Sequence, residues 1–326
     1  MAMRRILSVE PGADLAELTR RLQGLGLWAQ VAESARGHHT VALEAFSAQV
    51  STAQLLDLPG VSDVFSPVSK HPRVDAMCHQ AIEVAGHRLG VGHAPLVMAG
   101  PCSVEGEQQI HEVAKIVAAS GAHVLRAGAF KPRTSPYSFR GHGRDALQWL
   151  QEAATENGLG VVTEVMSEED VKVVGEATDL VQVGSRNMLN FALWRRIGEL
   201  GKPVLLKRGM ASPVDERLMA AEHLMAAGAT GVIFCERGIQ GLATETRNLL
   251  DLAAVALLSH VYGLPVVVDP SHGTGRRDLV LPMARAGLAA GAHGILVEVH
   301  PRPSEALSDG PQAISPSQLR ELTSLP

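Results

Sequence analysis

Six cationic side chains lie in or just after short apolar runs in this acidic chain. Three of them, Arg126, Lys207 and Arg237, are embedded in apolar runs, where an unpaired charge would be costly. Guanidinium groups match phosphate or carboxylate in two-point contacts, so the set favours a multiply anionic ligand over a solvated rim of surface charge. The six are Arg126, Lys131, Arg133, Arg186, Lys207 and Arg237.

A thiol, an imidazole and a carboxylate follow or end three further apolar runs, as Cys102, His272 and Glu298. Together these groups could hold one divalent transition metal ion, and such a set accepts Mn, Fe, Co or Zn. Asp309 is the best candidate for a fourth ligand, with Glu305 second. The alternative for each residue taken singly is structural, since a lone cysteine is usually a small buried hydrophobe.

Eight apolar runs between Pro95 and Pro301 carry these residues, and amphipathic stretches of helix length separate the runs. Continuous Val/Ile/Leu runs are typical of parallel strands buried on both faces, and their alternation with helices indicates βαβ units. We therefore predict an α/β protein with a (β/α)8 TIM barrel, whose polar residues converge at the carboxyl ends of the strands. The runs are PLVMAG, HVLRAG, GVVTEV, LVQVG, PVLLKRG, GVIFCERG, VVVDPSHG and GILVEVHP.

The residues before the barrel have a different pattern. Residues 1–66 alternate as βαββαβ, which predicts a small ferredoxin-like domain that serves in packing, oligomerisation or regulation. Residues 67–94 combine a proline-containing linker with a hairpin around Ala85 and Gly86 that could close the bottom of the barrel. Residues 95–326 then form the catalytic barrel.

Composition excludes several classes of protein. The net charge of −5 argues against a nucleic-acid partner, and 46% hydrophobic residues are ample for a core. No apolar run reaches the roughly 18 residues that span a membrane, and the N-terminus lacks the pattern of a secretory signal. Three widely spaced cysteines indicate a reducing compartment, so we expect a cytoplasmic protein.

Seven motifs follow one another along the barrel region: GPCS (100–103), KPRTSPYSF (131–139), GSRN (184–187), LLKRG (205–209), CERG (235–238), DPSHGTGRRD (269–278) and VEVHPRPSEALSDG (297–310). In this order they resemble the 3-deoxy-D-arabino-heptulosonate 7-phosphate (DAHP) synthases with a ferredoxin-like N-terminal domain. The resemblance covers about residues 95 to 312. The related 3-deoxy-D-manno-octulosonate 8-phosphate synthases share the barrel and the metal residues, but typically carry Ala-Asn-Arg where this chain has Lys-Pro-Arg-Thr at 131–134.

The resemblance implies the condensation of phosphoenolpyruvate with erythrose 4-phosphate, the first step of aromatic amino-acid synthesis. It also implies one divalent metal ion, Mn in first place, that polarises the aldehyde while C3 of phosphoenolpyruvate attacks it. Glu164, across the mouth from Lys207, is our candidate for handling the proton of the water that adds at C2, with an ion-pair role toward the cations of the mouth as the alternative.

By resemblance, the catalytic residues are Cys102, Lys131, Glu164, Lys207 and His272. The phosphoenolpyruvate site would comprise Arg126, Lys131, Arg186, Lys207 and Arg237. The erythrose 4-phosphate site would comprise Arg133, Thr134 and Ser135, and the metal site Cys102, His272, Glu298 and Asp309.

The resemblance further implies a tyrosine or phenylalanine effector at the N-terminal domain and a homo-oligomer, commonly a tetramer. The run LWAQVAES, however, offers few polar side chains for an effector pocket. Two other functions compete: the sister synthase acting on arabinose 5-phosphate, and a non-catalytic sensor of phospho-ligands or amino acids. The intact set of metal-ligand residues argues against the sensor.

Overall fold

The structure is a computed structural model that describes residues 5–44, 48, 50–131, 137 and 139–324. The chain divides into two compact units, Met1–Lys70 and His71–Pro326, and each is described by itself.

The N-terminal unit is a four-stranded antiparallel sheet with the strand order β2-β3-β1-β4. Its elements follow the predicted βαββαβ order, so the expectation of a small ferredoxin-like unit is confirmed. Apolar side chains from a strand and both helices, including Leu7, Leu18 and Leu55, are fully or almost fully buried in its core. The elements are β1 (Ile6–Val9), α1 (Leu15–Gly24), β2 (Ala29–Glu33), β3 (His39–Leu43), α2 (Thr52–Leu56) and β4 (Val61–Phe65).

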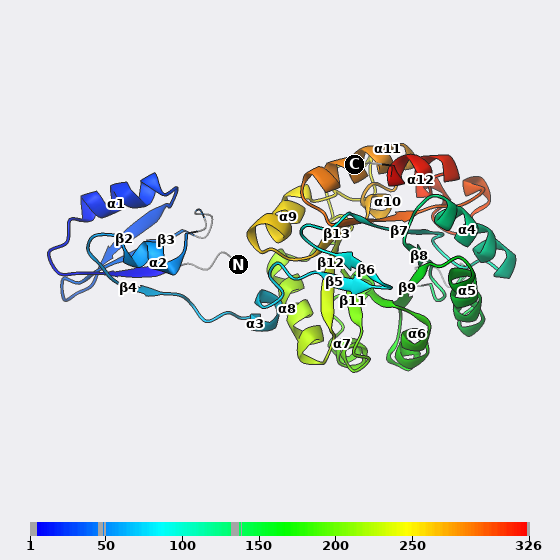
Figure 1. Ribbon diagram of the computed structural model, residues 1–326, viewed down its shortest axis with the longest axis horizontal. Helices are drawn as coiled ribbons and strands as arrows, with labels where there is room; N and C mark the ends of the chain where they lie inside the picture. The colour runs from blue at the N-terminus through cyan, green and yellow to red at the C-terminus, as the bar shows by residue number, and fades with distance from the viewer. Residues whose placement is uncertain (1–4, 45–47, 49, 132–136, 138, 325–326) are drawn as a thin grey trace. The chain divides into compact units, whose positions relative to one another are not determined.

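A short segment and a hairpin precede the barrel. Helix α3 (Pro72–Asp75) is fixed to the barrel because Glu222 accepts hydrogen bonds from its first backbone N–H groups. Strands β5 (Ile82–Val84) and β6 (His87–Leu89) form the predicted hairpin, which turns at Ala85 and Gly86, both with positive φ. In Figure 1 this hairpin lies across the middle of the ring of strands, and β5 contacts β11 and β12. The hairpin therefore lies across one end of the barrel.

The second unit contains the predicted barrel, a closed ring of eight parallel strands. Nearly every strand residue is buried, as the continuous apolar runs predicted. The strands are β7 (Leu96–Gly100), β8 (Val124–Arg126), β9 (Gly160–Val165), β10 (Leu180–Val183), β11 (Pro203–Lys207), β12 (Gly231–Glu236), β13 (Val266–Val268) and β14 (Gly294–Glu298).

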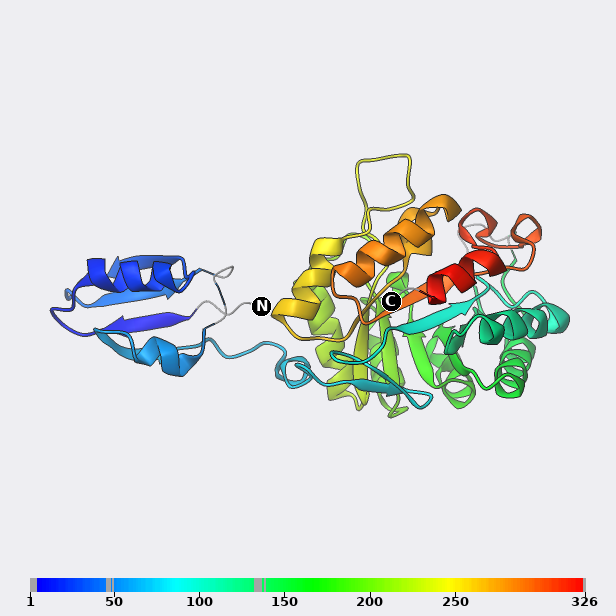
Figure 2. The same cartoon turned by 45° about the horizontal axis from the view of Figure 1, so that its top comes forward.

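Helices surround this ring and are amphipathic toward it, as α4 illustrates with its buried Ile110, Val113 and Val117. Between β12 and α9 a long loop projects from the barrel unit (Figure 2). The α-helices are α4 (Glu107–Ala119), α5 (Arg144–Glu156), α6 (Val171–Ala177), α7 (Phe191–Gly198), α8 (Val214–Ala226), α9 (Leu252–Ala256), α10 (Pro270–Thr274), α11 (Arg277–Ala289) and α12 (Pro316–Thr323). The 3₁₀ turns are η1 (Glu168–Asp170), η2 (Ser185–Asn187), η4 (Pro303–Glu305) and η5 (Gly310–Gln312), and η3 (Leu257–Val261) is a π-helical segment that continues α9.

All eight carboxyl ends lie at one end of a parallel barrel, and we call this end the mouth. The hairpin lies at the other end, because Ala85 and Ile82 lie beside Gly160 and Gly231, the first residues of β9 and β12. Across the described ranges, no helix combines the length and apolar character needed to cross a membrane.

Candidate active site

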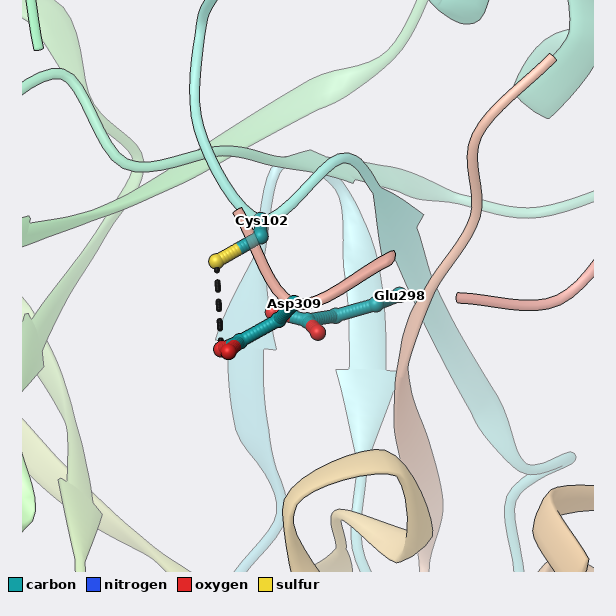
Figure 3. Close-up of side chains that lie close together, drawn as sticks. All are labelled: Cys102, Glu298 and Asp309. Carbon is teal, nitrogen blue, oxygen red and sulfur yellow. Dashed lines mark hydrogen bonds between the residues drawn. The ribbon is translucent and has the colours of Figure 1, made fainter. Parts of the chain in front are cut away.

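A thiol and two carboxylates meet at the mouth (Figure 3). Cys102 follows β7 and Glu298 ends β14, and the pairing of Glu298 with Gly100 brings the two side chains together. Asp309 comes from the loop after β14, and its carboxylate oxygen accepts a hydrogen bond of 3.4 Å from the Cys102 sulfur. The three ligand atoms lie within 4.8 Å of one another.

His272, in α10 after β13, faces the same cluster. Its Nε2 lies 3.5 Å from Glu298 Oε1 and 3.8 Å from Asp309 Oδ2. The second candidate, Glu305, is instead exposed and pairs with Arg302 at 2.7 Å. The structure thus brings Cys102, His272, Glu298 and Asp309 together and leaves Glu305 outside.

The electrostatics of this cluster suit a divalent cation. Burial and the nearby Glu298 raise the pKa of the Cys102 thiol to about 12. Burial also acts to raise the pKa of Glu298, but His272 and Arg126 hold it below its usual value, so two carboxylates face each other as anions. A bound cation would stabilise both carboxylates and convert the thiol to a thiolate. The donor set therefore fits a transition metal ion.

Asp269 was missed by the sequence analysis, although it opens the motif DPSHG. Its Oδ2 accepts a hydrogen bond of 2.8 Å from Lys207 Nζ and lies 2.8 Å from His272 Nδ1. Burial acts to raise the pKa of Asp269, but His272 and Lys207 hold it well below its usual value. The buried Asp269 carboxylate thus lies between the imidazole of His272 and Lys207, one of the predicted anion-binding cations.

Gln312 was also missed, because it lies in the long loop after β14 and carries no charge. Its side-chain amide donates a hydrogen bond of 2.6 Å to Glu298 Oε2 and accepts one of 3.0 Å from Arg247. Arg247 also lies 3.4 Å from Asp309 Oδ2. These contacts orient the two carboxylates of the cluster, as outer partners of metal ligands do.

Two of the predicted cations, Arg126 and Lys131, lie beside the cluster of Cys102, His272, Glu298 and Asp309. Arg126 donates hydrogen bonds of 2.9 Å both to Glu298 Oε1 and to the carbonyl of Pro101. Lys131 donates a hydrogen bond of 2.7 Å to the carbonyl oxygen of Cys102. Both cations therefore border the cluster of candidate metal ligands, Cys102, His272, Glu298 and Asp309.

Arg237, just after β12, is a buried cation with no carboxylate partner within the described residues. It is 5% exposed, and its hydrogen bond there is a long one, 3.4 Å to the carbonyl of Gly238. Burial lowers the pKa of Arg237; Asp269 acts against this shift, while the positive charges of Arg247 and Arg186 add to it. Because this buried guanidinium has no ion pair in the described residues and further cations act on it, the arrangement favours an anionic ligand.

Glu164, within β9, has a different partner from the one expected as its alternative role. Its Oε2 accepts a hydrogen bond of 3.0 Å from the side chain of Gln182, while Lys207 pairs with Asp269. No ion pair between Glu164 and a cation of the mouth is found in the described part of the chain. Arg133, Thr134 and Ser135 lie outside the described residues.

Comparison with known proteins agrees with this geometry. The model of the DAHP synthetase I family matches residues 30–325. The phospho-2-dehydro-3-deoxyheptonate aldolase of Thermotoga maritima is 48% identical over 241 residues, which cover 74% of this chain and 71% of that protein. A 2-dehydro-3-deoxyphosphooctonate aldolase of Acidithiobacillus ferrooxidans is 31% identical over 260 residues, 74% of this chain and 91% of that one.

Solved structures give the same result. The crystal structure of the Thermotoga maritima DAHP synthase superposes with a TM-score of 0.74 at 37% identity, covering 98% of this chain and 95% of that one. A truncated form of the Thermotoga enzyme gives a TM-score of 0.69 at 44% identity over 75% of this chain and 89% of that one. With this fold, this mouth and these relatives, the chain belongs to the DAHP synthetase I family.

Proposed function

We propose that this chain is a DAHP synthase, which condenses phosphoenolpyruvate, D-erythrose 4-phosphate and water into 3-deoxy-D-arabino-heptulosonate 7-phosphate and phosphate. This is the first step of the shikimate pathway to aromatic amino acids. The observation that carries the proposal is one mouth in which a metal-ligand cluster lies near Arg237, a buried cation without a carboxylate partner in the described residues. Membership of the DAHP synthetase I family supports the choice of substrates.

Phosphoenolpyruvate is assigned to the cations of the mouth. Lys207 is already balanced by Asp269, whereas Arg237 has no carboxylate partner in the described residues. The phosphate therefore belongs on the side of Arg237 and the exposed Arg186, where its charge balances the guanidinium groups. Arg126 and Lys131, which donate hydrogen bonds to Glu298 and to the carbonyl of Cys102, are assigned to the same site.

The metal ion is assigned to Cys102, His272, Glu298 and Asp309, and the family is generally metal-dependent. At this site a divalent ion would supply Lewis-acid polarisation of the aldose carbonyl. We favour Mn, with Fe, Co and Zn as alternatives, because a set of one thiolate, one imidazole and two carboxylates accepts all four. Asp269 would keep the His272 ring oriented through Nδ1.

In the reaction, C3 of phosphoenolpyruvate forms a bond to the aldehyde carbon while positive charge develops at C2. Water adds at C2 and loses a proton, and the C–O bond to phosphate then breaks. Glu164 is our candidate for accepting that proton, because its carboxylate is half-buried and Gln182, its partner, is neutral. The phosphate of the aldose is assigned to Arg133, Thr134 and Ser135.

The deciding experiment is a steady-state assay of phosphate release with erythrose 4-phosphate and with arabinose 5-phosphate. We expect erythrose 4-phosphate to be the better substrate, and a higher turnover with arabinose 5-phosphate would make the chain an octulosonate 8-phosphate synthase. Activity lost to a chelator and restored by Mn²⁺ would exclude a non-catalytic sensor.

The proposal extends to regulation, assembly and location. An aromatic amino acid would act through the N-terminal unit, which contributes none of the site residues, and the chain would be a cytoplasmic homotetramer. Repeating the assay with each aromatic amino acid tests the effector, and light scattering at the assay concentration tests the tetramer.

A further inference from the structure

Four charged side chains form a second cluster behind the mouth, between the barrel and its helices. We call it the buried charge cluster, and it consists of Arg208, Arg217, Glu236 and Asp251. Arg217 and Glu236 are 0% exposed, and Arg208 is 5% exposed. None of these four residues is part of the active site described above, so the burial of Arg208, Arg217 and Glu236 requires a separate explanation.

Glu236 is the centre of this cluster. Its Oε2 accepts hydrogen bonds of 3.0 Å from Arg208 and 3.4 Å from Arg217. Arg208 also donates one of 2.8 Å to Asp251, the residue that caps α9, and another of 2.9 Å to the carbonyl of Ser212. The cluster therefore connects the ends of β11 and β12 to α8 and to the start of α9.

The two strand ends joined in this way carry two cations of the phosphoenolpyruvate site. Lys207 pairs in register with Cys235, and adjacent strand residues point to opposite faces of a sheet. Because Lys207 directs its amine to Asp269 at the mouth, Arg208 and Glu236 direct their side chains outward to the helices. Arg208 is thus the chain neighbour of Lys207, and Glu236 is the chain neighbour of Arg237, both cations of the proposed phosphoenolpyruvate site.

Glu236 also holds the turn that presents Arg237. Its Oε1 accepts a hydrogen bond of 3.1 Å from the backbone N–H of Gly238, which has a φ of +90°. A Cβ at Gly238 would approach Asn248 Cβ to 2.7 Å and Gly273 Cα to 3.0 Å, so the turn is tightly enclosed. Arg237 itself has no ion-pair partner in the described residues, and its position depends on this turn.

We propose that Glu236 is a positioning residue for phosphoenolpyruvate: held by Arg208 and Arg217, it fixes the turn that presents Arg237 and the strand end that presents Lys207. This inference rests on the proposed function, since it assumes that both cations bind that substrate. Pairs buried in this way contribute little net stability, so a role in geometry explains them better than a role in folding.

The principal test is Glu236→Gln, which keeps the shape of the side chain but removes its charge. The KM for phosphoenolpyruvate should rise about 10- to 100-fold, as expected when a supporting residue is lost, while the KM for erythrose 4-phosphate changes less than about twofold. Calorimetric titration with phosphoenolpyruvate should give the same weakening in Kd. Equal changes in both KM values, or no change in either, would overturn the inference.

Two variants of Arg217 keep the test decisive if Glu236→Gln fails to fold. Arg217→Met keeps the apolar contact with Phe234, whose ring centre lies 5.2 Å from the guanidinium carbon, and should raise the KM for phosphoenolpyruvate about 3- to 10-fold. Arg217→Lys keeps the charge and should restore a KM near that of the unmodified chain. Equal KM values in the Met and Lys variants would overturn a role for the charge.

A matched control separates this inference from the proposed function. Glu199→Gln removes an exposed ion pair to Arg196 on the outer helix α7 and should leave all constants unchanged. If the unmodified chain releases no phosphate from the two substrates, the proposed function fails. If it is active but the KM for phosphoenolpyruvate is unchanged in every folded variant, only the positioning role fails.

Discussion

The two ends of the barrel differ in how their buried polar groups are partnered. At the mouth, Glu298 and Asp309 face each other, and Arg237 is buried without a carboxylate partner in the described residues. At the bottom, two histidines each accept a hydrogen bond at Nδ1, His123 from the N–H of Val97 at 3.0 Å and His293 from the N–H of Val266 at 3.1 Å. These two bottom histidines have partners within the protein, whereas under the proposed function the mouth is completed by its ligands.

This difference has an energetic meaning. Burying a cation such as Arg237 away from any ion-pair partner in the described residues costs folding free energy, so this side chain does not stabilise the empty barrel. The opposite end compensates through apolar contacts, and Val84 and Leu89 of the hairpin are at most 1% exposed. Substitutions at the mouth should therefore affect activity more than folding, and substitutions at the bottom should do the reverse.

The largest effect is expected for His272→Ala at the mouth. Losing the imidazole removes one ligand from the cluster, so metal-dependent turnover should fall to background while the melting temperature of the metal-free protein stays close to that of the unmodified chain. Phosphate release with added Mn²⁺ and circular dichroism melting measure the two outcomes. The control is His111→Ala, whose ring pairs with Glu156 on the outer helices. Retained turnover in His272→Ala would refute the ligand assignment.

Arg237→Met should give the next largest effect. The KM for phosphoenolpyruvate should rise about 10²- to 10³-fold, as for the loss of one partner of a buried charge pair, and stability should stay equal or increase because a buried cation is removed. Substrate kinetics and urea unfolding test both parts. Arg285→Met, which breaks an exposed pair to Glu321, is the control. If Arg237→Met lowered the free energy of unfolding and left the KM for phosphoenolpyruvate unchanged, the mouth would serve folding and not binding, contrary to the comparison between the two ends.

The sequence was sufficient to predict the barrel and most of the mouth. Parallel strands buried on both faces leave continuous apolar runs, and the residue types at their carboxyl ends identify the site. Cys102, His272, Glu298 and Asp309 converge because barrel closure makes β7 and β14 neighbours. Those predictions depended on local sequence patterns and on the fact that the first and last strands of a closed barrel pair with each other.

Other contacts could not be predicted because they depend on distant partners. Asp269 lies in the motif DPSHG, yet nothing in the neighbouring sequence indicates that its carboxylate pairs with Lys207, 62 residues away, and not with solvent. The same applies to Glu236, whose partner Arg217 lies on α8. Glu164 illustrates the converse, because Gln182 on the neighbouring strand, rather than Lys207, is its partner in the described residues. Charge alone therefore does not predict pairing.

A stability effect without a catalytic effect is expected for Leu89→Ala in the hairpin. Removing this fully buried side chain should lower the free energy of unfolding by about 2 to 5 kcal/mol, the usual range for such cavities, and leave kcat and both KM values unchanged. Urea unfolding and steady-state kinetics are the measurements. Val91→Ala, at a half-exposed position just after the hairpin, should change neither. A selective loss of activity in Leu89→Ala would show that the two ends are coupled.

The smallest expected effect is a pH dependence of stability from the bottom histidines. Burial, and the proximity of His87 and His260 respectively, lower the pKa values of His123 and His293, so the folded state keeps both rings neutral. The unfolded chain takes up protons below its histidine pKa of about 6.5, and stability falls as the pH drops from there.

The carboxylates behave differently in that pH range. Asp251 and Asp269, whose pKa values are lowered in the fold, lose their stabilising contribution only as the pH falls below the unfolded value of about 3.9. Of the mouth residues, His272 also has a lowered pKa and adds to the loss near neutrality. The double variant His123→Asn, His293→Asn removes the bottom contribution, because an amide oxygen can accept the same backbone N–H without titrating. Its melting temperature should decline less between pH 7 and pH 5 than that of the unmodified chain, and an identical decline would assign the whole effect to the mouth.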